Sequence, residues 1–173
     1  VYKRQKYKLV IVLSAMAGVT DDLQKLIDEI NHSCSQENDL VITSGEQVSV
    51  GLLSMQLNKM GIKSIPLLGW QVPIITDSSY KKARILNINN KNIKTHLQNH
   101  DVVVLAGFQG INEEGMVTSL GRGGSDLSAV AVAKFFETDS CEIYTDVEGV
   151  LTTDPAIHEK AKKIDKISYE EML

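Results

Sequence analysis

One short stretch of the sequence brings together three glycines, a guanidinium, two hydroxyls and a carboxylate. It runs Ser119-Leu120-Gly121-Arg122-Gly123-Gly124-Ser125-Asp126 and leads into a helix-like apolar pattern. Glycines let backbone N–H groups approach an anion, an arginine can bind a carboxylate or phosphate with two hydrogen bonds, and a helix N-terminus adds partial positive charge. The stretch therefore predicts an anion-binding corner. A plain turn with Asp126 as a helix cap is the structural alternative.

A second stretch, Tyr144 to Pro155, leaves an apolar run and carries carboxylates at two turns. Asp146 and Asp154 could order the ribose of a nucleotide or, through water, a magnesium ion, since that ion prefers a few carboxylates together with phosphate oxygens. Turn formation by the Asp side chains is the alternative, and Asp154-Pro155 taken alone favours it. The stretch therefore predicts a nucleotide-binding loop only when it is considered together with the glycine-rich stretch at 119–126.

Two further segments of small or polar residues follow apolar runs. Residues 14–21 come after Leu9 to Leu13, and Ser44-Gly45-Glu46 comes after Leu40 to Ile42. In doubly wound sheets such positions lie beyond the carboxyl ends of the strands, where ligands bind, so we expect both segments to line one cleft. For Glu46, a solvated residue in the first turn of a helix is an equally good interpretation.

The elements that must position these residues alternate along the chain. Apolar runs predict strands at 9–13, 40–42, 62–68, 102–106, 116–118 and 142–145, the first being central and buried on both faces. Helical spacing predicts helices capped at Thr20 or Asp21, at 48–60, at 91–98, at 127–136 and from 169 onward. Residues 70–91 are expected to be irregular, with short strands. The pattern indicates one α/β domain with a mostly parallel sheet.

Two of these helices have named apolar faces. The helix after residue 20 repeats Leu23, Leu26, Ile27 and Ile30, and the next repeats Val48, Leu52, Met55 and Met60. Residues spaced by three and four lie on one side of a helix, so we expect these sets to pack on the core. The same reasoning predicts that Leu127, Val130, Ala131 and residues 133–136 pack in the helix that follows the glycines.

Composition excludes several classes of protein. With 173 residues, 43% of them hydrophobic, the chain can bury one core, and a net charge of −4 gives no support to nucleic-acid binding. No apolar run reaches the length of about 20 residues that a membrane span needs. No metal motif is formed by Cys34, Cys141 and the four histidines, so we expect no protein metal site. Two cysteines far apart in the sequence give no disulfide framework, so we expect the protein in a reducing cytoplasm.

The chain resembles the aspartate kinases of the amino-acid kinase superfamily in five ordered segments. These are residues 12–21, 44–46, 107–110, 119–126 and 144–155. The Leu120 to Asp126 stretch is specific for that family, whereas the last segment is shared with kinases of uridylate, glutamate and acetylglutamate. The resemblance implies a three-layer αβα sandwich with a mostly parallel central sheet. It also implies that residues 1–173 are a catalytic domain without its N-terminal strand and phosphate loop, its C-terminal end or a regulatory domain.

The resemblance assigns roles residue by residue. L-Aspartate would be held by Thr20, Glu46, Arg122, Gly123, Gly124 and Ser125. Arg122 and Asp126 would be catalytic, with Arg122 pairing a substrate carboxylate and Asp126 organising the reacting groups. ATP would be held by Ser14, Ser125, Tyr144, Thr145, Asp146, Val150, Leu151, Thr152, Asp154 and Pro155. Mg²⁺ would bridge the phosphates, and the product, 4-phospho-L-aspartate, leads toward lysine, threonine and methionine.

The chain departs from the family's pattern in several places. Nothing before Tyr7 resembles the family's Lys-Phe-Gly-Gly segment, and a further family lysine lies beyond the last residue. Ser119 stands where Thr is usual, and Leu151 where an aromatic ring is common. Two alternatives follow: a related kinase acting on another acid, and a non-catalytic fragment or binding module. An assembly of identical chains is expected as one option, without nucleic acid or membrane partners.

Overall fold

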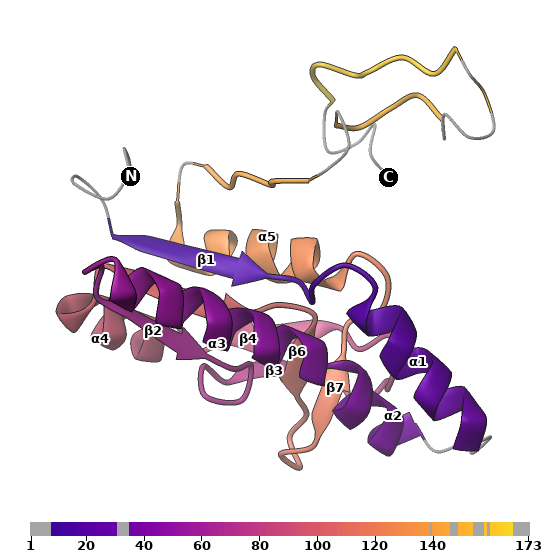
Figure 1. The fold of residues 1–173 in the computed structure, drawn as a ribbon, viewed down its shortest axis with the longest axis horizontal. Helices are drawn as coiled ribbons and strands as arrows, with labels where there is room; N and C mark the ends of the chain where they lie inside the picture. The colour runs from indigo at the N-terminus through magenta and orange to yellow at the C-terminus, as the bar shows by residue number, and fades with distance from the viewer. Residues whose placement is uncertain are drawn as a thin grey trace. The chain divides into compact units, whose positions relative to one another are not determined.

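The computed structural model describes residues 8–30, 35–138, 140–145, 149–153, 158 and 160–167. The chain divides into two compact units, residues 1–141 and 142–173, and each is described by itself. Figure 1 shows the elements of both units as a ribbon. Among the described residues, no helix combines the length and the apolar character that crossing a membrane requires.

A three-stranded parallel sheet forms the centre of the first unit. Its strands β1 (Leu9–Leu13), β5 (Val102–Ala106) and β2 (Ser64–Leu67) lie in the order β1-β5-β2. Leu9 pairs with Val102 and Leu13 with Ala106, while Ser64 pairs with Val102 on the other side. All of β5 is buried, as its continuous apolar sequence predicts.

The expected central position of β1 is wrong for the described part of the chain. Its five residues are all only partly buried, and it pairs with β5 alone. The apolar runs of β1 and β5 look alike in sequence. Which strand takes the centre is decided by the pairing partners that each finds, and only β5 finds one on both sides.

Helices cover both faces of this sheet and give the three layers that were expected. Val102, Val104 and Ala106 of β5 belong to the core cluster that contains Val50 of α3 (Ser44–Lys59). Val103 and Leu105 point to the other cluster, with Ile93 of α4 (Asn90–Asn99) and Val132 of α5 (Gly124–Phe136). Alternate side chains of a strand point to opposite faces, so one strand supplies both cores.

A second sheet of four short strands completes the first unit. Its strands are β4 (Ile85–Ile88), β3 (Ile74–Thr76), β6 (Gln109–Ile111) and β7 (Val117–Ser119), in the order β4-β3-β6-β7. The outer pairs are antiparallel, and β3 pairs with β6 in parallel. The short strands expected within 70–91 and near 116–118 are therefore confirmed.

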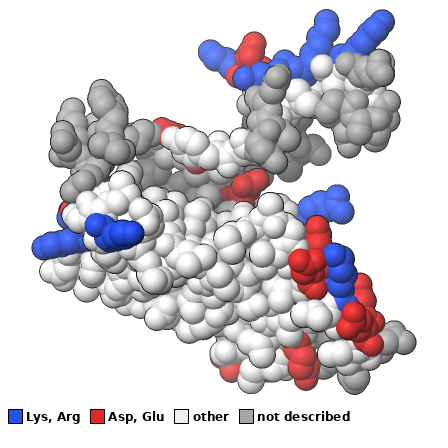
Figure 2. Space-filling model, in the orientation of Figure 1, with Lys and Arg blue, Asp and Glu red and all other residues white. Residues whose placement is uncertain are grey.

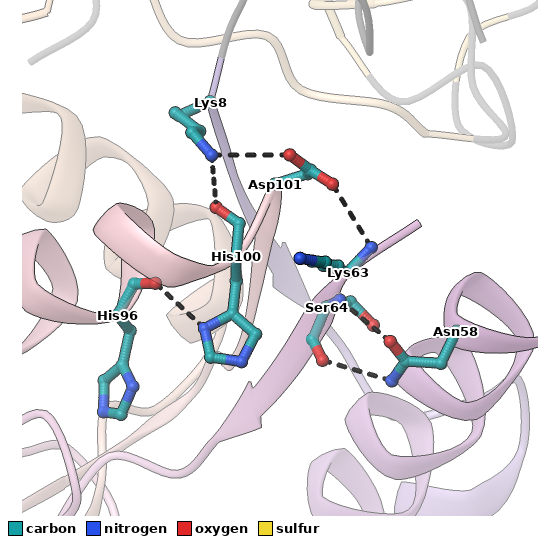
Figure 3. A network of polar contacts seen from close by, with 7 residues as sticks. All are labelled: Lys8, Asn58, Lys63, Ser64, His96, His100 and Asp101. Atoms are coloured by element: carbon teal, nitrogen blue, oxygen red, sulfur yellow. Dashed lines mark hydrogen bonds and ion pairs between the residues drawn. The ribbon is translucent and has the colours of Figure 1, made fainter. Parts of the chain in front are cut away.

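The amino ends of the strands in the parallel sheet are fastened by polar contacts (Figure 3). Asp101, just before β5, accepts hydrogen bonds from Lys8 Nζ at 3.4 Å and from the Lys63 amide at 3.3 Å. Asn58 exchanges two hydrogen bonds with the backbone of Ser64, at 3.0 and 3.1 Å. These contacts hold the first residues of β1, β2 and β5 in register. The carboxyl ends of the three parallel strands therefore lie at the same edge of the sheet.

Residues 40–42, expected as a strand, are the last turn of helix α2 (Ser35–Ile42). Asn38, Asp39 and Ile42 are buried, whereas Leu40 and Val41 are exposed. That spacing belongs to a helix, and a three-residue apolar run is too short to reveal it in sequence.

Helix α1 (Val19–Ile30) starts before Thr20, so the expected cap at Thr20 or Asp21 is wrong. Gly18, in the left-handed region at φ +80°, precedes the helix instead. Leu23 and Ile27 are partly buried as expected, but Leu26 and Ile30 are exposed. The apolar stripe is therefore wider than the face that the described residues cover.

Helix α3 turns a different face to the core than expected, and α5 does so only in part. Val48, Leu52, Met55 and Met60 around α3 are exposed, and the core side carries Val50, Leu53 and Leu57 with two buried serines. In α5, Leu127 and Val130 are exposed, contrary to expectation, whereas Ala131, Phe135 and Phe136 pack on the core as expected. Because α3 is apolar on several sides, sequence spacing could not identify the side that packs.

The described residues of the second unit include a short antiparallel pairing. Residues 150–152 face 162–164, with hydrogen bonds from the Ile164 amide to Val150 O at 2.8 Å and from the Thr152 amide to Lys162 O at 2.9 Å. Residues 142–145 form no strand, contrary to expectation. The helix expected from residue 169 lies outside the described residues.

Candidate active site

The loop after β1 meets the start of α3. The Ala15 amide donates a 3.0 Å hydrogen bond to Oε1 of Glu46. A Cβ on Gly45 would lie 2.8 Å from Ala15 Cβ, closer than real side chains approach, so the loop can reach the helix only where a glycine stands. The two segments that were expected to share a cleft are thus brought together at the carboxyl end of β1.

Glu46 lies in a buried position, with 3% of its surface exposed. Burial raises the pKa of its carboxyl, while the hydrogen bond from Ala15 works in the opposite direction. Its second oxygen, Oε2, is buried and has no hydrogen-bond partner among the described residues. The alternative of a solvated first-turn residue is therefore wrong. A buried carboxylate with one oxygen that lacks a hydrogen-bond partner is suited to accept a hydrogen bond from a cationic ligand.

The glycine-rich corner lies beside the loop that ends β5. A Cβ on Gly124 would lie 2.5 Å from a ring carbon of Phe108, so the helix start and this loop are in direct contact. Ser128 fastens them, because its Oγ accepts from the Phe108 amide at 3.0 Å and donates to Gly124 O at 2.8 Å. The corner is therefore held at the carboxyl end of the central strand.

The functional groups of the corner are open to solvent. Arg122 and Asp126 are exposed and Ser125 is partly buried. Helix α5 starts after Gly123, which is left-handed at φ +70° and provides no side-chain cap. Asp126 is the third helical residue and not the cap, so that alternative is wrong. The Gly124 amide donates to Gly121 O at 3.0 Å, but no side chain caps the start of α5, and the helix dipole makes this end suited to an anion.

One residue that the sequence analysis did not single out lies fully buried next to the corner. The carboxylate of Asp39 accepts hydrogen bonds from the amide and hydroxyl of Ser119, at 2.7 and 3.0 Å. An aspartate in a polar stretch is ordinarily exposed, and no local pattern distinguishes this one. Its role depends on a contact across 80 positions of sequence.

The residues expected to hold ATP are only partly described. Ser14 is exposed at the end of β1, and Thr20, expected at the substrate, is partly buried in the first turn of α1. In the second unit Tyr144 is exposed and donates to Glu142 Oε2 at 2.6 Å, and Thr145 is exposed too. Val150, Leu151 and Thr152 lie on the short antiparallel pairing. Asp146, Asp154 and Pro155 lie outside the described residues, so the nucleotide loop stays a prediction.

The described residues contain no ready-made metal centre. Within them, no three His, Cys, Asp or Glu side chains gather closely enough to hold an ion. The two aspartates expected near magnesium belong to the part of the chain that the structure does not describe.

Comparison with known proteins shows what this chain is similar to. Residues 1–173 match the family model described as the amino acid kinase family. An aspartate kinase of Pseudomonas fluorescens is 50% identical over 168 residues, which are 95% of this chain and 41% of the relative. The chain thus spans about two fifths of the length of that relative.

Solved structures agree with this result. The aspartate kinase of Synechocystis is 44% identical, with a TM-score of 0.70 over 90% of this chain and 26% of its own. E. coli aspartokinase III, in complex with aspartate and ADP, has a TM-score of 0.78 at 23% identity, over 90% of this chain and 46% of its own. The second likeness is evidence for the fold alone.

Proposed function

Because this chain belongs to the amino acid kinase family, we propose that it is the catalytic part of an aspartate kinase. The enzyme would transfer the γ-phosphoryl group of ATP to the side-chain carboxylate of L-aspartate and release 4-phospho-L-aspartate and ADP. The identity to named aspartate kinases supports this choice within the family. The structural observation that carries the proposal is that Oε2 of Glu46 is buried and has no hydrogen-bond partner among the described residues.

An ammonium group is the hydrogen-bond donor that suits Oε2 of Glu46 best. Oε1 of Glu46 is oriented by the Ala15 amide, and Oε2 has no partner among the described residues. A free amino acid brings an ammonium that pairs with the carboxylate and offsets the cost of burying it. Uridylate has no ammonium, and the amine of acetylglutamate is blocked. The site therefore favours a free amino acid over these two family substrates.

The glycine-rich corner supplies groups for the negative end of the substrate. Arg122 can bind a carboxylate with two hydrogen bonds, and the amides of Gly123, Gly124 and Ser125 lie at the positive end of α5. Glu46 and Arg122 together would hold an amino acid by opposite charges. Thr20 and Ser125 add hydroxyl groups in this proposal.

Phosphoryl transfer needs alignment and neutralisation of charge more than covalent chemistry by the protein. An oxygen of the aspartate side chain attacks the γ-phosphorus, the bond from this phosphorus to the bridging oxygen breaks, and ADP leaves with the electron pair. No proton needs to move, because the attacking carboxylate is already ionised. Arg122 would stabilise the charge that develops, and Asp126 would orient the reacting groups.

The nucleotide would be held by Ser14 and by the residues of the 144–155 loop. Magnesium, when bound with ATP, neutralises phosphate charge and requires few protein ligands. Asp146 and Asp154 are the carboxylates proposed to hold it.

The test is a phosphorylation assay of the full gene product with Mg-ATP and four acceptors: aspartate, glutamate, acetylglutamate and uridylate. We expect the highest kcat/KM with aspartate and none above background with uridylate. Preference for any other acceptor would refute the proposal. Calorimetric titration with ATP, comparing the parent with Asp146→Ala, measures nucleotide binding separately from turnover. ATP binding without phosphorylation of any acceptor would favour the non-catalytic alternative.

Two parts of the proposal concern the compartment in which the protein acts and its assembly with identical chains. We place it in the cytoplasm, where ATP is supplied, and expect an assembly of identical chains. Figure 2 shows that the surface over α3 carries few charged residues, whereas acidic and basic side chains gather over α1. Light scattering of the purified protein checks the assembly, and a monomer at micromolar concentration would contradict it.

A further inference from the structure

Asp39 is a fully buried carboxylate, and the groups that donate hydrogen bonds to it among the described residues are neutral. It accepts hydrogen bonds from the Lys81 amide at 3.0 and 3.1 Å and from the amide and hydroxyl of Ser119. Neither ion pair found among the described residues involves Asp39. Burying a charge is costly unless its oxygens are well bonded, so a network of this kind keeps its geometry firmly.

Both partners of Asp39 lie beside the backbone that leads into the glycine-rich corner. Ser119 ends β7, two residues before Gly121. Lys81 lies in the turn before β4 at φ +67°, a conformation that non-glycine residues rarely adopt. Its carbonyl oxygen would be 3.1 Å from a Cβ on Gly121, so the turn packs directly on the backbone that leads to Arg122.

The backbone of Asp39 is tied to the other half of the candidate site. Its carbonyl oxygen accepts from the Thr43 hydroxyl at 2.8 Å and from the Thr43 amide at 3.2 Å. Thr43 directly precedes α3, whose third residue is Glu46. Asp39 therefore has its backbone bonded to the start of the Glu46 helix and its side chain bonded to the strand that carries the Arg122 corner.

We propose that Asp39 is a positioning residue that fixes the separation between Glu46 and the Arg122 corner. This inference rests on the proposed function, in which these two residues hold the ammonium and a carboxylate of one amino acid. An amino acid has a set distance between its charges, so a shift of the corner weakens both contacts together. ATP is proposed to bind mainly through other residues and should be much less affected.

The chemistry of the network indicates which substitutions are informative. In Asp39→Ala the amides of Lys81 and Ser119 lose their acceptor in a buried place, and the corner is released. In Asp39→Asn the remaining oxygen can take the place of Oδ2 and accept from both amides, while the new NH₂ donates to Ser119 Oγ. The NH₂ also takes the place of Oδ1, which accepts from the Lys81 amide at 3.1 Å, so this second bond of the amide is lost. Asparagine should therefore restore much, but not all, of the function that alanine removes.

The experiment measures KM for aspartate and for ATP, together with the thermal midpoint, in the full gene product. For Asp39→Ala we expect aspartate KM to rise about tenfold or more, with ATP KM within about twofold. For Asp39→Asn we expect aspartate KM within about threefold of the parent. Asp77→Ala is the matched control, because Asp77 also accepts amide hydrogen bonds, from Ser79 and Arg84, but does not contact Ser119.

Three results would overturn the proposal: an unchanged aspartate KM in Asp39→Ala, an equal rise of both KM values, or a loss of kcat that only follows the folded fraction. If Asp39→Ala does not fold, Ser119→Ala serves instead. It removes one donor and keeps the amide bond, and we expect aspartate KM to rise about threefold. An unchanged value then overturns the proposal.

Failure of the proposed function gives a different result, since the parent then phosphorylates no aspartate. In that case amide hydrogen exchange tests Asp39 directly. We expect residues 119–124 to exchange faster in Asp39→Ala than in the parent and in Asp77→Ala. Equal rates in all three proteins would show that Asp39 does not hold the corner.

Discussion

The amide of Ala15 donates a 3.0 Å hydrogen bond to Oε1 of Glu46, while Oε2 of the same carboxylate is buried without a partner among the described residues. One oxygen is thus oriented by the protein and the other is left to accept a ligand. The arrangement keeps a charge in an unfavourable place, which is a common cost of a preformed site. It leads to predictions on binding, on stability and on pH.

Replacing Glu46 by glutamine should separate binding from stability. The glutamine side chain can still accept from the Ala15 amide but carries no charge, so we expect aspartate affinity to fall by about tenfold to a hundredfold. The free energy of unfolding at neutral pH should stay equal or rise, because no charge is buried. Calorimetric titration with aspartate and urea unfolding measure the two effects. Glu29→Gln on the exposed side of α1 is the control, and an unchanged aspartate affinity in Glu46→Gln would contradict this role.

The raised pKa of Glu46, caused by burial, predicts a pH dependence of stability. Between the ordinary pKa of glutamate and the raised one, the folded chain binds more protons than the unfolded chain. The free energy of unfolding contributed by Glu46 should therefore fall as pH rises through this window, and the loss is complete above the raised pKa. Urea unfolding at a series of pH values, parent minus Glu46→Gln, isolates this contribution. A difference that does not change with pH would argue against it.

Aspartate binding should depend on the same proton with the opposite trend. Pairing with an ammonium needs the ionised carboxylate, so aspartate affinity should decrease as pH is lowered through the raised pKa of Glu46. Titration calorimetry across that range measures the effect. Glu46→Gln should bind weakly at every pH, and a parent-like pH profile in that variant would assign the proton to another group.

Arg122 should affect aspartate more than ATP. In Arg122→Ala we expect aspartate KM to rise about tenfold to a hundredfold, since a paired charge is lost. Arg122→Lys should recover only part of this, because lysine cannot form two parallel hydrogen bonds. Steady-state kinetics with each substrate varied gives both values. Arg84→Ala, an exposed arginine on a neighbouring turn, is the control, and an equal effect of the two alanine variants would indicate a general charge effect.

Gly124 and Gly51 give opposite predictions for the same substitution. A Cβ at Gly124 would meet the Phe108 ring at 2.5 Å, so Gly124→Ala should lower the free energy of unfolding by about 1–3 kcal/mol. Gly51 lies inside α3 with no atom within 4 Å of a Cβ, so Gly51→Ala should raise it by about 0.5–1 kcal/mol. Urea unfolding compares them. Equal effects would mean that the corner does not touch the loop after β5.

Local sequence was sufficient for several parts of the fold. The five apolar residues of β5 predicted a strand, and the glycines at 121–124 predicted a turn before a helix. It also predicted that residues 14–21 and 44–46 meet, which they do, although the segment before Ser44 is a helix and not the expected strand. These features depend on period, turn chemistry and chain order, which are all written in the sequence.

Tertiary packing decided the rest. Asp39 is buried because Ser119 and Lys81, from distant parts of the chain, offer it hydrogen-bond donors, and residues 40–42 complete the same helix. Glu46 is buried, not solvated, because Gly45 lets the β1 loop come close. Hence the sequence by itself determined which segments bear charge and bend sharply. Which of those charges are buried, and which helix face is covered, followed only from contacts between residues far apart in the chain.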